Sequence, residues 1–370
     1  MASELVVPVV KIQNVRAHPN ADKLELCDVL GYQMCIPKGR YKGGELAVYF
    51  PADTLIPAEW ADKFGVRKFL KGKDQDRVGR VKLRGEPSFG LVADMPGCAN
   101  WEEGKNVAWH YQCKKYEPPV KVGCGDAAAY DEKIDPYFEK FTDVQNGRIF
   151  TDIFVEGEEV IFTEKIHGSN LRCGLINGEF VAGSMEVRRK IPTYKTEDGR
   201  DAPHSLDSDE MKRSTYWFPW SLTGVNSLME EFNSECNTEE ENKRAVVLYG
   251  EVYGGNIQSL DYGIPKGKGL GFRAFGLRVN GKFLDWDKFA EICQKHGVEM
   301  VPVLWRGPYS MAKAKELADG KSEMAGHMRE GTVCYPIMER ENPKIGRVIL
   351  KFVGIEYSLS KHQDMDTKDV

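Results

Sequence analysis

One lysine stands in a sequence context suited to covalent chemistry. Lys165 follows the apolar run 160–162 and precedes the turn-forming polar residues 166–170 (IHGSN). This pattern places the lysine where a strand ends and a loop begins. A lysine attacks phosphorus only in its neutral form, and its ordinary pKa of about 10.4 keeps it charged at pH 7. A site that uses Lys165 as a nucleophile must therefore lower this pKa with neighbouring cations or a metal.

Taken alone, the segment is as typical of a surface lysine before a glycine turn as of a nucleophilic lysine. Segments further along the chain favour the chemical interpretation. Glu251 follows the apolar run 245–247 and lies between glycines, and Glu330 precedes a turn glycine. Residues 271–279 (GFRAFGLRV) predict a strand with two aromatic side chains, and Lys351 stands in a further apolar strand, where packing gives no reason for a lysine. Carboxylates for a metal and cations for phosphate are both required for phosphoryl transfer.

These segments, in this order, resemble those of the covalent nucleotidyltransferases and, among them, the nick-sealing ATP-dependent RNA ligases. The resemblance extends from about residue 138 to residue 352. Residues 164–170 (EKIHGSN) look like the ligase nucleophile motif in its His-Gly variant. Residues 138–146 (FEKFTDVQN) look like the segment that opens these ligase domains, and residues 249–263 contain stretches similar to the third ligase motif and the loop after it.

The resemblance implies a ligase that joins RNA 3′-OH and 5′-phosphate ends in nicked or splinted RNA, in RNA repair. Lys165 would take AMP from ATP as a phosphoramidate, AMP would pass to the RNA 5′-phosphate, and the 3′-OH would displace it. Mg²⁺ or Mn²⁺ is expected at Glu330 and Glu251. The expected nucleotide-binding residues are Glu164, His167, Asn170, Arg188, Glu251, Phe275 and Lys351. From the residues alone, His167 and Asn170 are equally well ordinary loop and turn residues.

Two assignments stay open at this stage. Phe275 is expected to stack on adenine, with burial in the core as the alternative, and a regular strand would put Phe272 on the opposite face. The region that supplies an arginine to the ribose and to the nick phosphate contains both Arg188 and Arg189, and the sequence does not fix which of them faces the ribose.

The chain departs from the ligase pattern near its end. These ligases commonly carry two lysines two residues apart in the last motif, whereas here Lys351 is followed by Val353. Either Lys351 acts alone, or Arg347 or Lys361 assists it. Tyr335 also stands where a lysine often follows the acidic turn. These departures bear on the identity of the RNA substrate more than on the first step, the transfer of AMP to Lys165.

Length and composition describe a soluble globular protein. The 370 residues suffice for two domains, and 41% are hydrophobic and 29% charged. Apolar runs fall far short of the roughly 18 residues of a membrane span, and the N-terminus lacks a signal-peptide pattern, so we expect an intracellular protein without membrane attachment. Nine cysteines without metal-binding spacing predict reduced thiols, with Cys173 in the core.

The overall charge does not indicate nucleic-acid binding, but its distribution does. The formal net charge is -5, yet basic residues concentrate between positions 63 and 84. The residues expected to bind RNA there are Arg67, Lys68, Lys71, Arg80 and Lys82. A solvated charged loop is the alternative interpretation of this stretch.

The N-terminal part predicts a small β-barrel. Short β-prone runs occupy residues 6–12, 24–30, 33–36 and 46–50, with turn glycines between them. Residues 15–24 (VRAHPNADKL) resemble the opening hairpin of tRNA-binding OB modules. Together with residues 44–51, this hairpin resembles the N-terminal OB module of one branch of RNA ligases.

We therefore expect an α+β protein with an N-terminal OB-like β-barrel and its connector in residues 1–135. An α+β nucleotidyltransferase domain built on antiparallel sheets would follow in residues 136–370. Within these domains we expect an irregular connection at 97–137, a polar loop at 196–213, and helices at 230–243, 288–296 and 312–318.

Rival functions remain open on the sequence alone. The chain ends at Val370, 19 residues after Lys351, which leaves no room for the C-terminal OB domain of DNA ligases and capping enzymes. A GTP-using capping-type enzyme is nevertheless the enzymatic rival, and a non-catalytic RNA-binding protein on a ligase scaffold is the other. The physiological RNA, the metal preference, the oligomeric state and any protein partner are not determined by the sequence.

Overall fold

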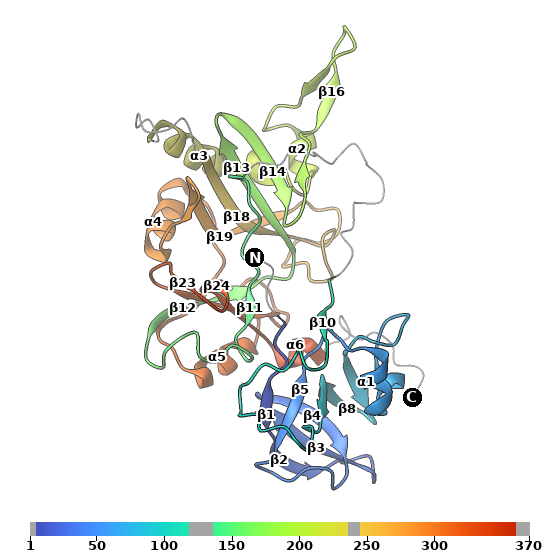
Figure 1. Cartoon of the computed structure of the whole chain (residues 1–370). Helices are drawn as coiled ribbons and strands as arrows, with labels where there is room; N and C mark the ends of the chain where they lie inside the picture. The colour runs from blue at the N-terminus through green and yellow to red at the C-terminus, as the bar shows by residue number, and fades with distance from the viewer. Residues whose placement is uncertain (1–4, 118–135, 236–244, 360–370) are drawn as a thin grey trace. The chain divides into compact units, whose positions relative to one another are not determined.

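The computed structural model describes residues 5–117, 136–235 and 245–359 (Figure 1). The chain divides into two units. Within the described residues, the first unit contains 5–117, Asn146–Thr151 and Leu359, and the second contains 136–145 and 152–358. No helix in these ranges is long and apolar enough to cross a membrane.

The first unit consists mainly of short antiparallel strands. One sheet has the order β1-β5-β9 and another the order β2-β3-β4. Their bounds are β1 (Val9–Lys11), β2 (Gln13–Ala17), β3 (Leu24–Val29), β4 (Tyr32–Pro37), β5 (Leu46–Phe50) and β9 (Leu91–Ala93). The strands expected from the β-prone runs are confirmed at β1, β3, β4 and β5. Val9, Val48 and Phe50 point into one core with Tyr111, which explains the apolar composition of these runs.

The remaining elements of the first unit are short. They are β6 (Thr54–Leu55), α1 (Ala58–Lys63), η1 (Arg67–Phe69), β7 (Arg80–Leu83), β8 (Glu86–Phe89) and β10 (Lys114–Lys115). The segment Asn146–Thr151 belongs to this unit although it lies beyond the expected boundary at residue 135. Its Arg148 is buried with the guanidinium 4.9 Å from the centre of the Tyr32 ring, and the Asn146 amide donates a hydrogen bond to the Tyr32 hydroxyl.

Two antiparallel sheets form the second unit. The larger has the order β15-β14-β13-β18-β19-β20, and the smaller has the order β11-β25-β22-β12-β21. The larger sheet contains β13 (Ser169–Ile176), β14 (Glu179–Ser184), β15 (Arg188–Arg189), β18 (Ala245–Tyr253), β19 (Gly271–Val279) and β20 (Lys282–Phe283). The smaller contains β12 (Glu159–Lys165), β21 (Val303–Pro308), β22 (Gly331–Pro336), β25 (Leu350–Val353) and β11 (Gln145–Asn146), of which only Gln145 belongs to the second unit.

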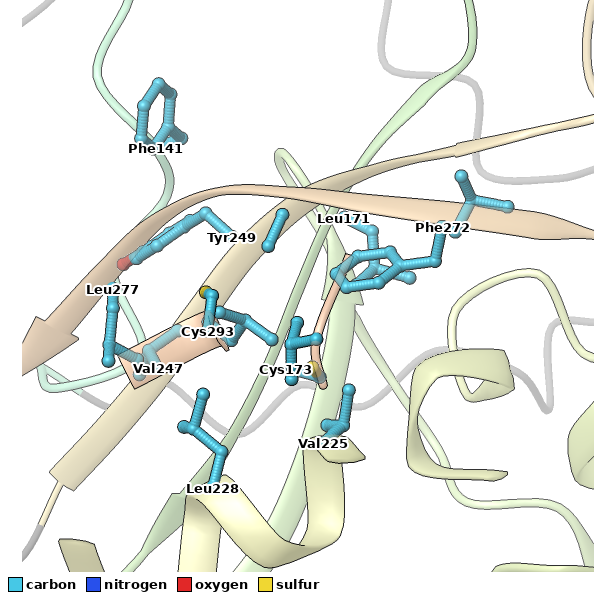
Figure 2. Packing of buried hydrophobic residues seen from close by; sticks show 14 of the residues in the cluster. Phe141, Leu171, Cys173, Val225, Leu228, Val247, Tyr249, Phe272, Leu277 and Cys293 are labelled. Carbon is cyan, nitrogen blue, oxygen red and sulfur yellow. The ribbon is translucent and has the colours of Figure 1, made fainter. Parts of the chain in front are cut away.

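Helices cover one face of the larger sheet. In Figure 2, Val225 and Leu228 of α3 (Thr223–Glu235) lie close to Cys173 on one side of the sheet, whereas Phe141 lies on the other side. Phe289 and Cys293 of α4 (Trp286–His296) belong to the same apolar core. On the other face, the ring of Phe141 packs against that of Tyr249 in β18.

The structure confirms two of the expected helices and corrects two other predictions. Helix α4 and helix α5 (Met311–Ala318) lie where they were expected, while α3 begins at Thr223 rather than at residue 230. Residues 236–243 of that prediction lie outside the described residues. The apolar side chains at positions 225, 228 and 229 follow helical spacing and bury this earlier turn.

The polar segment 196–213, expected as a loop, contains regular structure. A hairpin pairs β16 (Thr193–Lys195) with β17 (Asp201–Pro203), and α2 (Asp209–Arg213) follows it. Gly199 has φ of 81° in the turn, a conformation that glycine adopts without strain. The other elements of the second unit are η3 (Phe218–Ser221), β23 (Glu341–Asn342), β24 (Gly346–Arg347) and α6 (Ile355–Leu359).

Candidate active site

The end of β12 brings Lys165 to a carboxylate that lies far away in sequence. Lys165 pairs with Gly331 of β22, so the preceding residue, Glu330, stands beside the lysine. The distance from Lys165 Nζ to Glu330 Oε1 is 2.6 Å. Gly331 permits this approach, because a Cβ atom there would lie 2.2 Å from the carbonyl oxygen of Phe352.

A second carboxylate approaches from the larger sheet. Glu251 of β18 accepts a hydrogen bond from the backbone N–H of Gly168, with 3.1 Å between the nitrogen and Oε1. A Cβ atom on Gly168 would lie 2.2 Å from the carbonyl oxygen of Val252, so only glycine fits here. Asn170 pairs with Glu251 across the strands and therefore shares its face of the sheet. Its Oδ1 is buried without a hydrogen-bond partner among the described residues.

The three charged groups shift one another's pKa values. Burial alone would lower the pKa of Lys165, but Glu330 and Glu251 raise it above the ordinary value for lysine. Burial raises the pKa of Glu251 to about 8, and Glu330 acts in the same direction. Burial opposes ionisation of Glu330 as well, yet Lys165 and His167 hold its pKa below the ordinary value. The unliganded site thus holds a protonated lysine beside an ionised Glu330.

His167 contacts two tyrosines that sequence reasoning did not assign to the site. Its backbone N–H donates to the hydroxyl of Tyr262 at 2.7 Å, and its Nδ1 lies 3.1 Å from the hydroxyl of Tyr357. Nδ1 is also 3.5 Å from Oε2 of Glu330. Tyr262 has φ of 49°, uncommon for a bulky residue, and the Asp-Tyr-Gly turn around it was the available sequence signal. No comparable signal marked Tyr357.

Glu164 does not share the face of β12 that carries Lys165. Neighbouring residues of a strand point to opposite faces. The side chain of Glu164 is 1% exposed, and its Oε2 accepts a hydrogen bond from the backbone N–H of Glu323 at 2.8 Å. The structure therefore separates this predicted nucleotide-binding side chain from the lysine that follows it.

The register of β15 distinguishes Arg188 from Arg189. Arg188 pairs with Gly183, and Gly183 pairs with Arg172, which is two residues from Asn170 on the same face of β13. Arg188 therefore lies on the face that carries Asn170, where its guanidinium donates to Glu179 at 2.5 Å. Arg189 lies on the opposite face.

The environment of Arg189 agrees with this register. Its guanidinium lies 5.0 Å from the centre of the Tyr216 ring, and the Tyr216 hydroxyl is 3.4 Å from Oγ of Ser169. Ser169 pairs with Val252, a buried residue next to Glu251 in β18, and so lies on the face away from that carboxylate.

Phe275 stands at an irregularity of β19. Tyr249 pairs with Gly276 and Gly250 pairs with Ala274, so Phe275 is an extra residue in a β-bulge. The centroid of its ring lies 4.7 Å from that of the Phe141 ring, and Phe275 is half-buried. Both expectations for Phe275, adenine stacking and packing in the core, are compatible with this position.

Lys351 shares the face of the smaller sheet with the candidate nucleophile. It pairs with Val333, and Val333 pairs with Thr163, two residues before Lys165. Val353, where a second lysine is common, pairs with Gly331, which in turn pairs with Lys165, so Val353 lies on this face one strand beyond Gly331.

The two residues considered as substitutes for that second lysine differ in what the structure shows. Arg347 is bound to Glu339 through two hydrogen bonds of 2.7 and 2.5 Å and stacks on Phe283, so its charge is largely compensated. Lys361 lies outside the described residues. Tyr335 is buried with its ring 4.9 Å from that of Trp286, in the core.

The donor set around Lys165 is compatible with a divalent cation that phosphates help to hold. Among the described residues, no group of three histidine, cysteine or acidic side chains could bind a metal by itself. Glu330 and Glu251 nevertheless both act on Lys165 electrostatically. Mg²⁺ usually retains waters and is bound by one or two carboxylates together with substrate phosphates. Two carboxylates fit that requirement.

The five basic residues expected to bind RNA lie in the first unit. Arg67 and Lys68 are in η1, Arg80 and Lys82 are in β7, and Lys71 lies between these elements. Arg67 forms an ion pair with Asp62, with 2.8 Å between Nη1 and Oδ2. Arg80 and Lys82 alternate with Val81 and so share one face of their strand.

Comparisons with known proteins bear on both units. The RNA ligase family model matches residues 158–353, more than half of the chain, and an OB-fold domain model matches residues 6–95. These matches confirm the expected OB-like module and the α+β ligase domain. No curated protein sequence matches this chain.

Solved structures of an RNA ligase from Naegleria gruberi share the fold. A variant with ATP and Mn aligns with a TM-score of 0.67 at 19% identity, over 98% of this chain and 100% of that one. The ligase with PPi aligns with a TM-score of 0.65 at 20% identity, over 96% and 98%. A variant with AMP and Mn aligns with a TM-score of 0.66 at 19% identity, over 97% and 99%.

Proposed function

Because this chain belongs to the RNA ligase family, we propose that it joins RNA 3′-OH and 5′-phosphate ends through a covalent AMP adduct on Lys165. The observation that carries this proposal is the contact between Lys165 and Glu330, with Glu251 as a second carboxylate that acts on the lysine electrostatically. In the unliganded site these carboxylates raise the pKa of the amine, so a divalent cation that offsets them is required before the neutral amine can attack a phosphate.

ATP is the proposed AMP donor. The Naegleria gruberi ligase structures contain ATP, AMP, PPi or Mn, which supports a first step that takes AMP from ATP and releases pyrophosphate. The buried Oδ1 of Asn170 and the ring of Phe275 are proposed to contact the nucleoside. Asn170 pairs with Glu251 across the strands, and Phe275 lies on β19, which is paired with the strand of Glu251. Lys351 and Arg188 would contact phosphate oxygens.

The first step requires the ammonium group of Lys165 to release a proton to solvent. The neutral amine then attacks the α-phosphorus, a nitrogen–phosphorus bond forms, and the bond to the pyrophosphate oxygen breaks. A divalent cation at Glu330 and Glu251 would supply positive charge that offsets these carboxylates and the triphosphate. Glu251 also fixes the Gly168 turn through the backbone N–H, and this keeps the lysine and the following loop in a fixed relation.

The later steps return Lys165 to its starting form. An oxygen of the RNA 5′-phosphate attacks the AMP phosphorus, and the lysine leaves as an amine that takes up a proton. The RNA 3′-OH then attacks the 5′-phosphate, AMP leaves, and a phosphodiester bond remains. All these steps depend on charge neutralisation and positioning, so Lys351 and Arg188 would serve in each.

The first unit is proposed to bind RNA. OB folds commonly hold oligonucleotides on strands and loops. The basic residues of η1 and β7 would follow the phosphate backbone of a nicked or splinted substrate. On this division of labour, the second unit forms the nucleotide site and the first contributes affinity for RNA.

Mass spectrometry of the purified protein after incubation with ATP and Mg²⁺ or Mn²⁺ tests the proposal. We expect one added AMP, located by peptide mapping at Lys165. Lys344→Ala, which removes an exposed lysine paired with Asp152, is the matched control and should retain the adduct. Absence of any adduct in the wild-type protein would instead support a non-catalytic RNA-binding role.

Parallel incubations with labelled ATP and labelled GTP separate a ligase from a capping-type enzyme. The proposal predicts retention of the label from ATP only. Retention of the GTP label alone would contradict the proposed donor while leaving Lys165 as the nucleophile.

A further inference from the structure

Glu164 is an unusual residue for its position. It directly precedes Lys165 in β12, but its side chain points to the other face and is 1% exposed. The hydrogen bond from the Glu323 backbone to its Oε2 is 2.8 Å long. This is a contact between residues 159 positions apart in sequence.

Fold stability alone does not explain a carboxylate at this position. Burial of an acidic group is costly unless its oxygens are fully hydrogen-bonded, and an apolar residue of similar volume often serves as well or better. Oε1 of Glu164 is buried without a hydrogen-bond partner among the described residues, and so is Oγ1 of Thr332, which pairs with Glu164 across the strands. A costly, incompletely satisfied acid indicates a requirement other than packing.

Glu323 belongs to a closed loop that leads directly to Glu330. We term residues 320–330 the acidic loop after Glu323 and Glu330. Two backbone hydrogen bonds of 2.9 Å, from Ser322 to His327 and from Arg329 to Gly320, close this loop. These cross-links make the two sides of the loop move together. A tether at Glu323 therefore also restrains the position of Glu330.

The acidic loop has a second anchor on the other side of the lysine motif. The ring of His327 packs against that of Tyr262, with 4.6 Å between centroids. The Tyr262 hydroxyl in turn accepts the hydrogen bond from the backbone of His167. The loop is thus held at the residue before Lys165 and at the residue two after it.

We propose that Glu164 is a positioning residue, which fastens the acidic loop to β12 so that Glu330 meets Lys165. The inference rests on the proposed function, because it assigns importance to the contact between Glu330 and Lys165. The strand itself sets the spacing, since the anchor and the nucleophile are consecutive residues. Glu164 acts through Glu330 and does not contact the nucleotide with its side chain.

Amide hydrogen exchange of the unliganded protein tests the tether directly. In Glu164→Met, which keeps the volume and removes the acceptor, peptides from residues 320–330 should exchange faster than in the wild type. Glu164→Gln retains a carbonyl oxygen and should restore protection. Glu323→Ala keeps the backbone N–H and is the matched control, with wild-type exchange expected. Unchanged exchange of the acidic loop in a folded Glu164→Met protein would overturn the inference.

Single-turnover adenylylation tests the functional consequence. Loss of a residue that orients a metal ligand typically costs about 10- to 100-fold, and Glu164→Met should fall in this range, with Glu164→Gln recovering most of the rate. Combining Glu164→Met with Glu330→Ala should add little to the loss from Glu330→Ala alone, because both changes remove the same contact. Losses that multiply would show that Glu164 does not act through Glu330.

The outcomes separate this inference from the proposed function. Normal adenylylation by Glu330→Ala would contradict the role of Glu330 and therefore this inference, while the adduct on Lys165 would still support the proposed function; absence of any adduct in the wild-type protein would contradict the proposed function itself. Impaired adenylylation by Glu330→Ala, together with wild-type rates for Glu164→Met, would overturn only the positioning role. Should Glu164→Met fail to fold, Glu164→Asp, whose shorter side chain moves the acceptor back from Glu323, provides the same comparison against Glu164→Gln.

Discussion

The site around Lys165 and the basic stretch of the first unit hold their charges in different ways. In the site, Lys165, Glu251 and Glu330 come from separate strands and a loop, and each changes the pKa of at least one other. In the basic stretch, the cations are neighbours in sequence, and Arg67 is 41% exposed at the side chain. The first arrangement requires the fold, whereas the second needs only a local surface.

This difference predicts different energetic consequences. Charges that are largely buried interact strongly, because the local dielectric constant is low. Exposed charges are screened by salt and contribute little individually. Substitutions in the site around Lys165 should therefore change rates by orders of magnitude, and substitutions in the basic stretch should change RNA affinity by small, salt-dependent factors.

The largest effect is expected from Lys165→Ala. It should abolish the AMP adduct and the ligation of RNA with an ordinary 5′-phosphate, because it removes the amine that is proposed to form the phosphoramidate. Sealing of RNA that already carries AMP at its 5′ end should survive in part, since the covalent task of the lysine is then complete. Gel-based ligation of the two substrates measures both outcomes.

The matched protein for this comparison is again Lys344→Ala, which should seal both substrates at wild-type rates. Adduct formation by Lys165→Ala would show that the nucleophile lies elsewhere. Equal loss on both substrates would show that the lysine serves mainly in a later step.

Removal of one of the two carboxylates near Lys165 is expected to have the second-largest effect. Glu330→Ala should slow single-turnover adenylylation by about 10²–10³, the usual cost of one fixed electrostatic group. Glu251→Ala should have a similar effect and would also release the Gly168 turn. Rapid-quench measurement of the adduct gives the rates. A rate near that of the wild type for either variant would return that glutamate to a purely structural role.

The pH dependence of stability tests the burial of Glu251. Its pKa is raised by burial to about 8 in the folded protein, whereas the pKa of a glutamate in the unfolded chain is about 4.3. The folded state therefore binds a proton more tightly, and stability should fall as the pH rises through this window. Glu251→Gln removes this dependence and should gain stability relative to the wild type between pH 5 and pH 9.

Urea unfolding of both proteins across this pH range provides the measurement. Glu341→Gln changes an exposed glutamate and should leave the wild-type slope intact. Identical slopes for the wild type and Glu251→Gln would show that Glu251 is solvated and ionised throughout.

The smallest effects are expected in the basic stretch. The double substitution Arg80→Ala and Lys82→Ala should weaken RNA binding modestly and leave adenylylation unchanged. Each lost phosphate contact should reduce the slope of log affinity against log salt by about 0.7 to 0.9. Binding titrations at several salt concentrations measure this slope. An unchanged slope would mean that these side chains do not contact the RNA backbone.

The whole chain is the appropriate background for that test. Removal of residues 1–135 would take away Tyr32, on which the buried Arg148 stacks. It would also remove the rest of the unit to which the segment Asn146–Thr151 belongs. A truncated protein that cannot adenylylate would then report damaged folding as readily as a contribution of the first unit to the nucleotide site.

Local sequence patterns predicted the elements of the fold well where the signal was local. The short β-prone runs became β1, β3, β4 and β5, because alternation and turn glycines are properties of neighbouring residues. The start of α3 and the β16–β17 hairpin were not predicted. Both segments are mainly polar, so the helical spacing of the apolar residues in α3 and the turn of the hairpin were not recognised. Sequence also named Lys165, Glu251 and Glu330 together.

Other features of the site depend on pairing between distant segments. The bulge at Phe275 and the opposite faces of Arg188 and Arg189 follow from strand register, which no single strand encodes. The hydroxyl groups of Tyr262 and Tyr357 reach His167 only because the chain returns to it after long intervals. Neither tyrosine stood within the nucleophile motif.

The sequence by itself determined which groups this protein has for its chemistry, because an amine, two acids and their glycine turns are written in short contiguous motifs. Only the tertiary structure decided how they act. Burial sets the pKa of Glu251, register places Glu330 against Lys165, and the alternation of β12 turns Glu164 away from the lysine that it precedes. Such effects arise from the environment of a side chain, and that environment exists only after strands far apart in sequence have paired.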